Sequence, residues 1–376
     1  MRQGKYSGAI LSLVLLIGLI LPSAVFADGP DNKFDATDVK IMKKVGLDAR
    51  TLKGKIPNIR GYQKHDWQAD AGSLISPLPP GGKRYAILTG ISDYPGEGTV
   101  LQGGPDLYYA DNDAVDMQNV LIGVYGFDPA KIKLLMGPND LTNPENAVVP
   151  GVVSAEATRK NILRAINDVK RKATSKDEVV FHFSGHAAQG MVNDRHVRAK
   201  ESGIVPCDVN LEEPAGPDSN IIWDRELKSA FSGFEANRIV FLFDMCFAGG
   251  MTDLQGQNRI VLMSTGAGGI AVEYGPAYYS LTGDVPLTGF EDMANGVFTY
   301  LFAKAGIAAG YADLPDFGGN GDGKVTVEEA FSFAKNSITE YSDMILYMLE
   351  QFGYTGLTAR DETPVMVDRF RGDLLP

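Results

Sequence analysis

Cysteine is scarce in this chain: its 376 residues include only Cys207 and Cys246. Two cysteines exclude a disulfide framework, and a single bridge between them is the most that the chain could form. Cys207 follows residues 203–206 in a pattern typical of a buried strand end, where a free thiol behaves as a small hydrophobic group. We therefore expect Cys207 to be buried and free.

Basic residues are also in deficit, at 35 Lys and Arg against 47 Asp and Glu, which gives a formal net charge of −12. Nucleic-acid binding needs clustered Lys and Arg for phosphate contacts, so this composition disfavours a nucleic-acid partner. An acidic protein attracts cationic substrates instead. Hydrophobic residues make up 44% of the chain and charged residues 22%, which is typical of a globular protein.

Long apolar runs are absent beyond the start of the chain. Arg2 and Lys5 precede the apolar residues 9–21, and small residues follow as far as Ala27, which is the pattern of a secretory signal peptide over residues 1–27. The run is short for a membrane span, which makes an uncleaved anchor the less favoured alternative. We expect no membrane span after cleavage, a formal charge of −14 because two basic residues are lost, and a secreted, periplasmic or cell-surface location.

Residues 28–83 are weakly patterned, rich in Lys and Arg, and end in a Pro/Gly cluster, so we interpret them as an N-terminal extension, a candidate pro-segment with a linker. Apolar strand patterns then alternate with helical patterns over residues 84–376. Strands are predicted at 85–91, 132–136, 179–183, 239–243 and 260–263, and helices at 111–122, 158–172 (capped by Thr158), 224–231, 295–309 and 327–338. This alternation indicates an α/β domain with a mostly parallel central sheet covered on both faces.

Two of the predicted strands lead into reactive side chains. Residues 179–183 are followed by His186, and residues 239–243 by Cys246. Catalytic groups of open α/β sheets collect where the strands end, and a thiol becomes nucleophilic when a neighbouring imidazole takes its proton. The alternative for Cys246 is a buried structural thiol, but two such strand ends together favour a catalytic dyad.

The other histidines are not expected to take part in catalysis. His182 lies inside a predicted strand, and we interpret it as a packed core residue with satisfied hydrogen bonds. His65 and His196 lie in segments without regular patterning, and we interpret both as surface residues.

Residues 183–186 (Phe-Ser-Gly-His) and 244–246 (Asp-Met-Cys) resemble the His and Cys signatures of the caspase-like cysteine peptidases, particularly bacterial metacaspases. His186 precedes Cys246 by 60 residues, which is comparable with the caspase spacing of roughly fifty. Further similarity lies at residues 85–94, 107–114, 222–227 and 296–300. The resemblance covers residues 84–373 and implies a three-layer α/β/α caspase-like sandwich.

The resemblance also implies roles for individual residues. His186 would be the general base and Cys246 the nucleophile, and the backbone N–H groups of Ala187 and Cys246 would form the oxyanion hole. The family usually has Gly at the position of Ala187. A positive φ there would be costly for Ala, so the backbone geometry at this residue is an open question.

The same match implies the substrate pocket. Asp244 is two residues from Cys246 and points to the same side of an extended segment. Asp113 and Asp244 would bind a basic side chain, with Ser184 and Ala110 nearby. Two buried carboxylates are costly unless a cation joins them, which favours protein or peptide substrates cleaved after Arg or Lys. The alternative role for Asp113 is stabilisation of a helix N-terminus.

Cys–His chemistry requires no cofactor, but two segments are candidate calcium sites. Residues 316–329 resemble half of an EF-hand or dockerin-type loop, with a plain Gly-rich turn as the equal alternative. The candidate ligands there are Asp316, Asn320, Asp322, the Lys324 carbonyl and Glu329, with Asp316 standing in because Gly318 occupies the first position. A second, incomplete site implied by the resemblance would use Asp224 and Asp253, where Trp223 stands in place of a usual acid.

Arg259 is the only basic residue between Met245 and Tyr300, and it directly precedes a predicted strand. We therefore expect a single-chain catalytic domain, with any activating cleavage between Lys40 and Lys83. The favoured activity is cysteine endopeptidase. The alternatives are a related specificity, such as cleavage after Asn, and a catalytically silent binding protein with the same fold. The oligomeric state does not follow from the sequence.

Overall fold

The structure is a computed structural model that describes residues 75–96, 105–143, 146, 148–194, 197–210, 219–271, 273, 294–338 and 363–375. The predicted signal peptide and most of the predicted extension lie outside these residues, as do His65 and His196.

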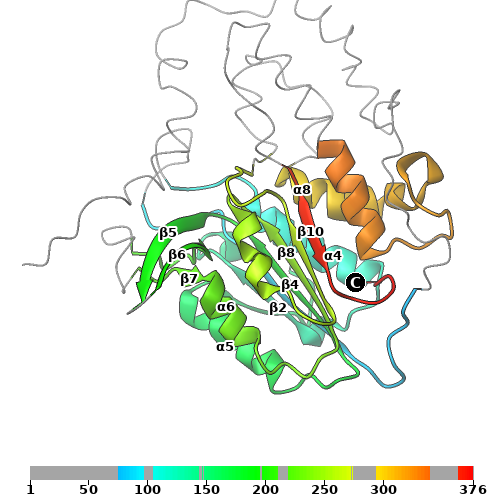
Figure 1. Cartoon of the computed structure of the whole chain (residues 1–376), viewed down its shortest axis with the longest axis horizontal. Helices are drawn as coiled ribbons and strands as arrows, with labels where there is room; N and C mark the ends of the chain where they lie inside the picture. The colour runs from blue at the N-terminus through cyan, green and yellow to red at the C-terminus, as the bar shows by residue number, and fades with distance from the viewer. Residues whose placement is uncertain are drawn as a thin grey trace, which may run out of the picture.

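The centre of the molecule is a seven-stranded sheet with the strand order β10-β9-β8-β4-β1-β2-β3 (Figure 1). Its strands are β1 (Arg84–Gly90), β2 (Ile132–Met136), β3 (Val153–Glu156), β4 (Glu178–Ser184), β8 (Arg238–Asp244), β9 (Arg259–Met263) and β10 (Val365–Asp368). Neighbouring strands are parallel, except that β10 runs antiparallel to β9. The predicted mostly parallel sheet is confirmed, while β3 and β10 were not predicted.

Helices cover both faces of this sheet. The face with α5 (Arg159–Lys170) and α6 (Asp224–Phe231) lies opposite the face with α4 (Ala110–Gly123), as Figure 1 shows. On the α4 side, α8 (Val297–Thr299) continues into the wider turns of a π-helix, η7 (Tyr300–Ala308), and a further helix covers residues 327–338. The five predicted helices are therefore present, and the three-layer α/β/α architecture is confirmed.

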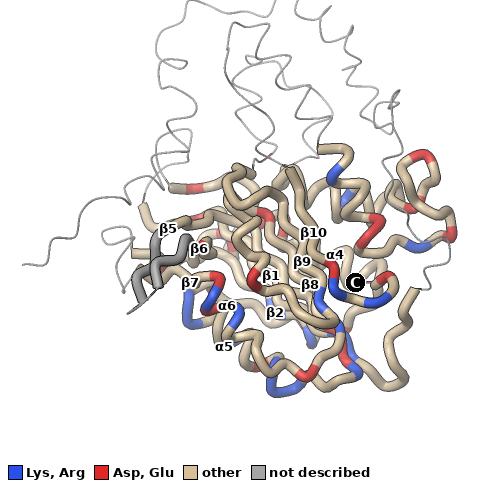
Figure 2. Tube along the Cα trace, viewed as in Figure 1, with Lys and Arg blue, Asp and Glu red and all other residues tan. Residues whose placement is uncertain are grey.

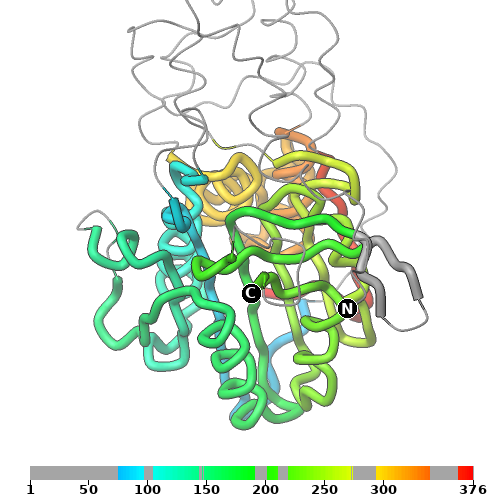
Figure 3. Tube along the Cα trace, turned by 90° about the vertical axis from the view of Figure 1, so that its left-hand side faces the viewer, coloured from blue at the N-terminus to red at the C-terminus, as the bar shows by residue number. Residues whose placement is uncertain are grey.

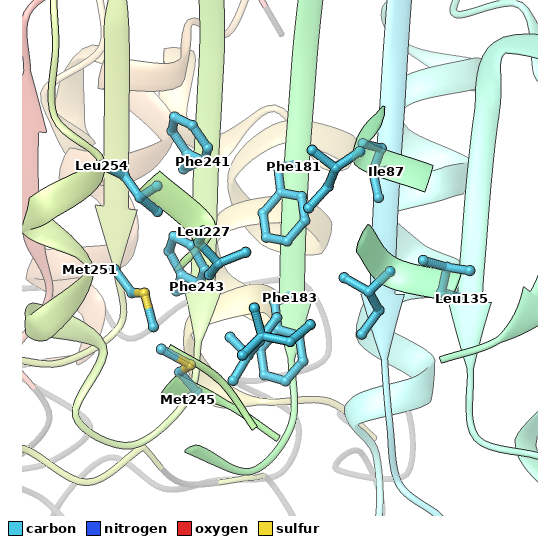
Figure 4. Packing of buried hydrophobic residues seen from close by; sticks show 14 of the residues in the cluster. Ile87, Leu135, Phe181, Phe183, Leu227, Phe241, Phe243, Met245, Met251 and Leu254 are labelled. Atoms are coloured by element: carbon cyan, nitrogen blue, oxygen red, sulfur yellow. The ribbon is translucent and has the colours of Figure 1, made fainter. Parts of the chain in front are cut away.

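The strands are buried on both faces, which explains their continuous apolar sequences. Phe181 and Phe183 of β4 pack with Phe241 and Phe243 of β8 against the α5 and α6 layer (Figure 4). Val180 faces the α4 layer instead, because side chains alternate along a strand. Each fully buried phenylalanine stabilises the fold by about 2 kcal/mol, so these neighbouring strands hold a fixed register.

Short elements connect the layers. The Thr158 hydroxyl accepts a hydrogen bond from the Asn161 N–H at 3.2 Å, as predicted for the start of α5. Among the described residues, the 3₁₀ turns are η3 (Pro129–Lys131), η4 (Asp140–Thr142), η5 (Ala248–Leu254), η8 (Tyr311–Asp313) and η9 (Pro315–Phe317). Few charged residues lie along the middle of the central sheet (Figure 2).

A second, three-stranded antiparallel sheet was not predicted. It consists of β5 (Ala187–Asp194), β6 (Val197–Ile204) and β7 (Ile222–Trp223), in the order β5-β6-β7. The β5 and β6 strands lie side by side, as can be followed in Figure 3. Because β5 begins directly after β4, the small sheet fixes the direction in which the chain leaves the central sheet.

The last residues of the predicted extension pack on the domain. The Ser76 N–H donates to the Asp373 carbonyl at 2.9 Å, and the Arg238 guanidinium donates to the Ser76 hydroxyl and the Pro77 carbonyl, each at 2.7 Å. The Lys83 carbonyl accepts from the Glu178 N–H at 2.9 Å. Residues 75–83, which we call the N-terminal strap, thus belong structurally to the domain.

Cys207 is a free thiol and is buried just beyond β6, as expected. Burial raises the pKa of its thiol to about 12, which keeps it protonated and unreactive. Across the described ranges, no helix combines the length and the apolar composition that a membrane span needs.

Candidate active site

The predicted dyad residues leave the sheet from adjacent parallel strands. Ser184 of β4 is paired with Asp244 of β8, and the Gly185 N–H donates to the Asp244 carbonyl at 3.3 Å. His186 and Cys246 each follow two residues after that pair, at the same edge of the sheet. The spacing of 60 residues between them equals the register offset between the two strands.

The imidazole of His186 is oriented by a backbone carbonyl. Its Nε2 lies 2.7 Å from the Pro105 oxygen, which can only accept a hydrogen bond. Nε2 therefore carries the proton of the neutral ring, and Nδ1 keeps the lone pair that a general base needs. Burial lowers the pKa of His186, while the contact with Pro105 raises it, so the ring is neutral at neutral pH and able to accept a proton.

Cys246 lies on a tight bend after β8. Its half-buried Sγ is 3.8 Å from the Ala271 carbonyl. The next residue, Phe247, has φ 58° and ψ 21°, a left-handed conformation that non-glycine residues rarely adopt. The bend is held by the Phe247 N–H, which donates to the Gly269 carbonyl at 2.8 Å, and by the Ser264 hydroxyl, which accepts from the Met245 N–H at 3.1 Å. A strained position beside a candidate nucleophile fits a functional site.

The backbone geometry answers the question about Ala187. Ala187 faces Ile204 across the small sheet, and the Val205 N–H donates to the His186 carbonyl at 3.1 Å. This pattern makes Ala187 and Ile204 a non-hydrogen-bonded pair, so the Ala187 N–H points away from β6. The positive φ falls at Gly185, at 149°, and Ala187 has none. An N–H is therefore directed outward beside His186 without strain at the alanine.

The two predicted pocket carboxylates converge. A Cβ placed on Gly296 would lie 2.5 Å from Asp244 Oδ2 and 2.7 Å from Asp113 Oδ2, so both acids lie against this glycine. The Ser184 hydroxyl donates to Asp113 Oδ2 at 2.6 Å, which brings the third predicted pocket residue to the same place. Ala110 is buried as the first residue of α4, one turn before Asp113.

The donors to these carboxylates are neutral. Asn295 Nδ2 and the Gly296 N–H donate to Asp113 Oδ1 at 2.9 and 3.0 Å. The N–H and the hydroxyl of Thr299 both donate to Asp244 Oδ2 at 2.8 Å. Burial, followed by the charge of Asp244, raises the pKa of Asp113 well above its ordinary value, and burial raises the pKa of Asp244 to about 6.

A third carboxylate, Glu273, was missed by the sequence analysis. Its two carboxylate oxygens accept the backbone N–H groups of Tyr108 and Tyr109 at 3.0 and 2.9 Å, at the entrance to α4. Glu273 also forms an isolated antiparallel bridge with Gly296, beside Asp113 and Asp244. Burial raises the pKa of Glu273 to about 7. No motif signals this residue, because it lies far along the chain from α4.

One prediction for His182, that its ring nitrogens have hydrogen-bond partners, is wrong. His182 is packed in β4 with 0% exposure, but neither ring nitrogen has a hydrogen-bond partner among the described residues, so it is not the satisfied histidine that we predicted. Its strand neighbours are Leu88 and Leu242, which offer no polar atom from their side chains. Burial therefore lowers the pKa of His182 to about 3.

The first candidate calcium segment folds into a polar loop. The Asn320 N–H donates to Glu329 Oε1 at 3.2 Å, and the Asp322 N–H donates to Asn320 Oδ1 at 2.8 Å. Asp313, rather than the predicted Asp316, accepts the Asp322 and Gly323 N–H groups, each at 3.0 Å. The Lys324 N–H donates to Asp322 Oδ1 at 2.9 Å.

The second candidate segment brings its two acids near each other. Asp224 is buried and accepts the Ser202 N–H at 3.2 Å, and the charge of Asp253 contributes to raising the pKa of Asp224, after burial. Asp253 is exposed and 3.8 Å from Lys228 Nζ. In the part of the chain that the structure describes, no three His, Cys, Asp or Glu side chains are arranged to hold a metal ion, so calcium stays a prediction at both segments.

Comparison with known proteins finds similarity to metacaspases. A model described as metacaspase, peptidase C14 domain, matches residues 84–255, which include both dyad residues. Metacaspase-4 of Arabidopsis thaliana is 29% identical over 173 residues, covering 45% of this chain and 34% of that protein. Metacaspase-1 of Schizosaccharomyces pombe is 30% identical over 175 residues, covering 46% and 36%.

Metacaspase III c of Phaeodactylum tricornutum matches more of the chain, at 25% identity over 255 residues, 67% of this chain and 66% of that protein. A Geobacter sulfurreducens protein of known crystal structure covers 77% of this chain and 94% of its own, at 14% identity and a TM-score of 0.40. The match spans about a third of the length of the plant relative. Residues 84–255 are thus similar to the metacaspase, peptidase C14 domain, a type of caspase-like cysteine peptidase domain.

Proposed function

We propose that this protein is a secreted endopeptidase that hydrolyses peptide bonds after Arg or Lys. The observation that carries the proposal is the placement of His186 and Cys246 at one sheet edge, beside the buried Asp113 and Asp244 whose donors are neutral. The dyad supplies the chemistry, and the two carboxylates supply selectivity for a cationic side chain.

The reaction follows from the positions of the donors and acceptors. Nδ1 of His186 takes the thiol proton, and Cys246 Sγ attacks the substrate carbonyl carbon. The N–H groups of Ala187 and Cys246 stabilise the resulting oxyanion. The imidazolium gives its proton to the leaving amine as the C–N bond breaks, which leaves an acyl-thioenzyme. Water, deprotonated by the same imidazole, then attacks the thioester and releases the acid and the thiol.

Specificity for Arg or Lys is supported by electrostatics. Asp113 and Asp244 are held together by neutral donors. Burial raises the pKa of both carboxyl groups, and the charge of Asp244 raises that of Asp113 further. A guanidinium or ammonium group between them would favour the ionised forms and form charge-assisted hydrogen bonds. An acidic substrate side chain would be repelled, so cleavage after Asp is disfavoured.

Persistence as a single catalytic chain is part of the proposal. Arg259 begins β9, and its guanidinium donates to the carbonyls of Leu254 at 3.1 Å and Phe231 at 2.8 Å. Its side chain is therefore engaged within the domain and unsuited to entering a second active site. Activating cleavage, where it occurs, would fall in the N-terminal extension.

Secretion and calcium are also proposals. Secretion is supported by the signal-peptide pattern of residues 1–27, which lie outside the described residues. Calcium, if bound by the loop of Asn320, Asp322 and Glu329, would stabilise that loop and take no part in the Cys–His chemistry.

The experiment compares residues 28–376 with the Cys246→Ala variant on fluorogenic Arg, Lys, Asn and Asp peptides, with calcium and with a chelator. We expect turnover of Arg and Lys peptides that the variant lacks. Turnover of Asn peptides alone would replace the basic specificity. No turnover in any condition, combined with an alkylation rate at Cys246 typical of an ordinary buried thiol, would favour the silent binding protein.

A further inference from the structure

Tyr94 is a buried tyrosine whose hydroxyl lies at the backbone of the dyad histidine. It follows β1 in sequence and is 4% exposed. Its Oη accepts the His186 N–H at 2.8 Å and is 3.3 Å from the Val205 carbonyl, to which it donates. One hydroxyl therefore joins three segments: the residues after β1, the residues after β4 and the residues after β6.

The backbone of His186 is held on both sides as a result. Its N–H is bound by Tyr94, and its carbonyl is bound by the Val205 N–H at 3.1 Å. The His186 carbonyl and the Ala187 N–H belong to one planar peptide unit. Fixing His186 therefore also fixes the direction of the N–H that would stabilise the oxyanion.

Tyr94 also contacts what orients the imidazole. Its ring lies against the His186 ring, with centroids 4.7 Å apart and the planes tilted by 46°. The Tyr94 N–H donates to Asp106 Oδ1 at 3.0 Å, and Asp106 follows Pro105, whose carbonyl binds His186 Nε2. Tyr94 thus supports His186 in three ways: it binds the His186 backbone, it packs on the His186 ring, and it binds the segment whose carbonyl accepts from the His186 ring.

Gly185 is matched to the tyrosine hydroxyl. A Cβ at residue 185 would lie 2.6 Å from Tyr94 Oη, with the next atoms at 3.3 and 3.5 Å. The φ of 149° at Gly185 disfavours a side chain as well. The hydroxyl therefore occupies the space that only glycine leaves open at the turn from β4 into β5.

We propose that Tyr94 is a positioning residue for the dyad, whose hydroxyl sets the backbone of His186 and Ala187 so that base and oxyanion donor face the same substrate carbonyl. This inference rests on the proposed peptidase function. Tyr94 forms and breaks no bond in the proposed reaction and acts through His186.

The test uses Tyr94→Phe, which keeps the ring and removes the hydroxyl, and Tyr125→Phe as a matched control. Tyr125 also donates to a backbone carbonyl, that of Val325, at 2.8 Å. Its own carbonyl accepts from Arg84 at the start of β1, the end of the sheet opposite to His186. The measurements are the rate of Cys246 alkylation by iodoacetamide against pH, located by mass spectrometry, and kcat and KM on an Arg peptide. Unfolding in urea confirms that each variant is folded.

We expect Tyr94→Phe to lose about tenfold in kcat and in alkylation rate at neutral pH, with KM within about twofold, since one neutral hydrogen bond corresponds to roughly that factor. Tyr125→Phe should match the wild type in both. Equal rates in Tyr94→Phe and wild type would overturn the role of Tyr94 and leave the peptidase intact. Slow wild-type alkylation without turnover would remove the proposed function, and this inference with it.

A second readout isolates the hydroxyl from general destabilisation. Gly185→Ala is placed in the wild-type and Tyr94→Phe backgrounds, and stability is measured in all four proteins. The strain of φ is common to both backgrounds, so only the clash with Oη differs. We expect Gly185→Ala to lower the urea midpoint less in the Tyr94→Phe background. Equal losses would show that the hydroxyl does not define this turn.

Discussion

At the scale of single residues, the proposed binding of a basic side chain by Asp113 and Asp244 would depend on pH. Asp244 has a pKa of about 6 with only neutral donors, and a cation would lower it by favouring the charged form. Binding of a basic side chain therefore releases a proton below that pKa. Between about pH 4 and about pH 6, Asp244 is protonated in the folded protein but ionised in the unfolded chain. With the pocket empty, the folded state therefore loses stability as pH rises from about 4 through about 6.

We predict that the inactive Cys246→Ala variant binds an Arg peptide about tenfold more tightly at pH 7 than at pH 5, from one proton released at a pKa of about 6. Calorimetry in two buffers of different ionisation enthalpy would measure both affinity and proton release. The matched citrulline peptide, which has the same shape without the charge, should bind weakly at both values. An Arg affinity that is independent of pH would contradict the assignment of Asp244 to the pocket.

The other residue-scale prediction concerns His182. Its pKa is lowered in the folded protein to about 3, so the unfolded chain binds the extra proton, and this contribution to stability is lost as pH falls from about 6.5 towards 3. His182→Leu removes two unpaired polar atoms and should stabilise the fold by about 1–3 kcal/mol at pH 7. At pH 5 the gain should be larger by roughly 2 kcal/mol.

Urea unfolding of both proteins at the two pH values measures the His182 effect. A variant that is less stable at both would show that the imidazole has a stabilising contact within the fold. His186, which follows β4, is unchanged in this variant, so activity serves as a check that β4 keeps its position.

At the scale of elements, helices and strands with a periodic apolar pattern can be predicted from the sequence, whereas elements defined by pairing in three dimensions cannot. β2 and α6 were predicted at their observed bounds, because each has its own apolar pattern. The β5–β6 hairpin was not predicted, although it orients Ala187 through its pairing with Ile204. Its polar, irregular sequence carries no periodic signal, and only pairing in three dimensions defines it.

The candidate site divides in the same way. His186 and Cys246 were predicted because each follows an apolar strand, and the register of β4 with β8 brings their strand ends together. Glu273 and Tyr94 accept hydrogen bonds from backbone N–H groups of distant segments, and such contacts leave no spacing rule in a single sequence. The failure at His182 has a different cause: alternation predicts that a strand residue is buried, but not whether its polar atoms find partners.

At the scale of the whole molecule, the two ends of the described chain meet. Ile75 bridges to Asp373 in parallel, next to the 2.9 Å hydrogen bond from Ser76, and Arg238 of β8 binds the strap while its guanidinium lies 5.3 Å from the Phe370 ring. The N-terminal strap is therefore attached to the strand that leads to Cys246. This limits where the extension can be removed without disturbing β8.

We predict that a chain beginning at residue 84 is less stable than one beginning at residue 70 by about 2–4 kcal/mol, because Arg238 loses two charge-assisted hydrogen bonds at about 1.5–3 kcal/mol each, partly replaced by water. Urea unfolding measures the difference, and turnover of an Arg peptide shows whether the strand end moves. The Ser76→Ala variant of the longer chain should show part of the loss.

Activating cleavage would then have to fall before residue 75, among the lysines and arginines between Lys40 and Lys64, since a cut at Lys83 would release the strap. Equal stability and equal turnover in the two chains would show that the strap is dispensable and that cleavage as late as Lys83 is compatible with activity.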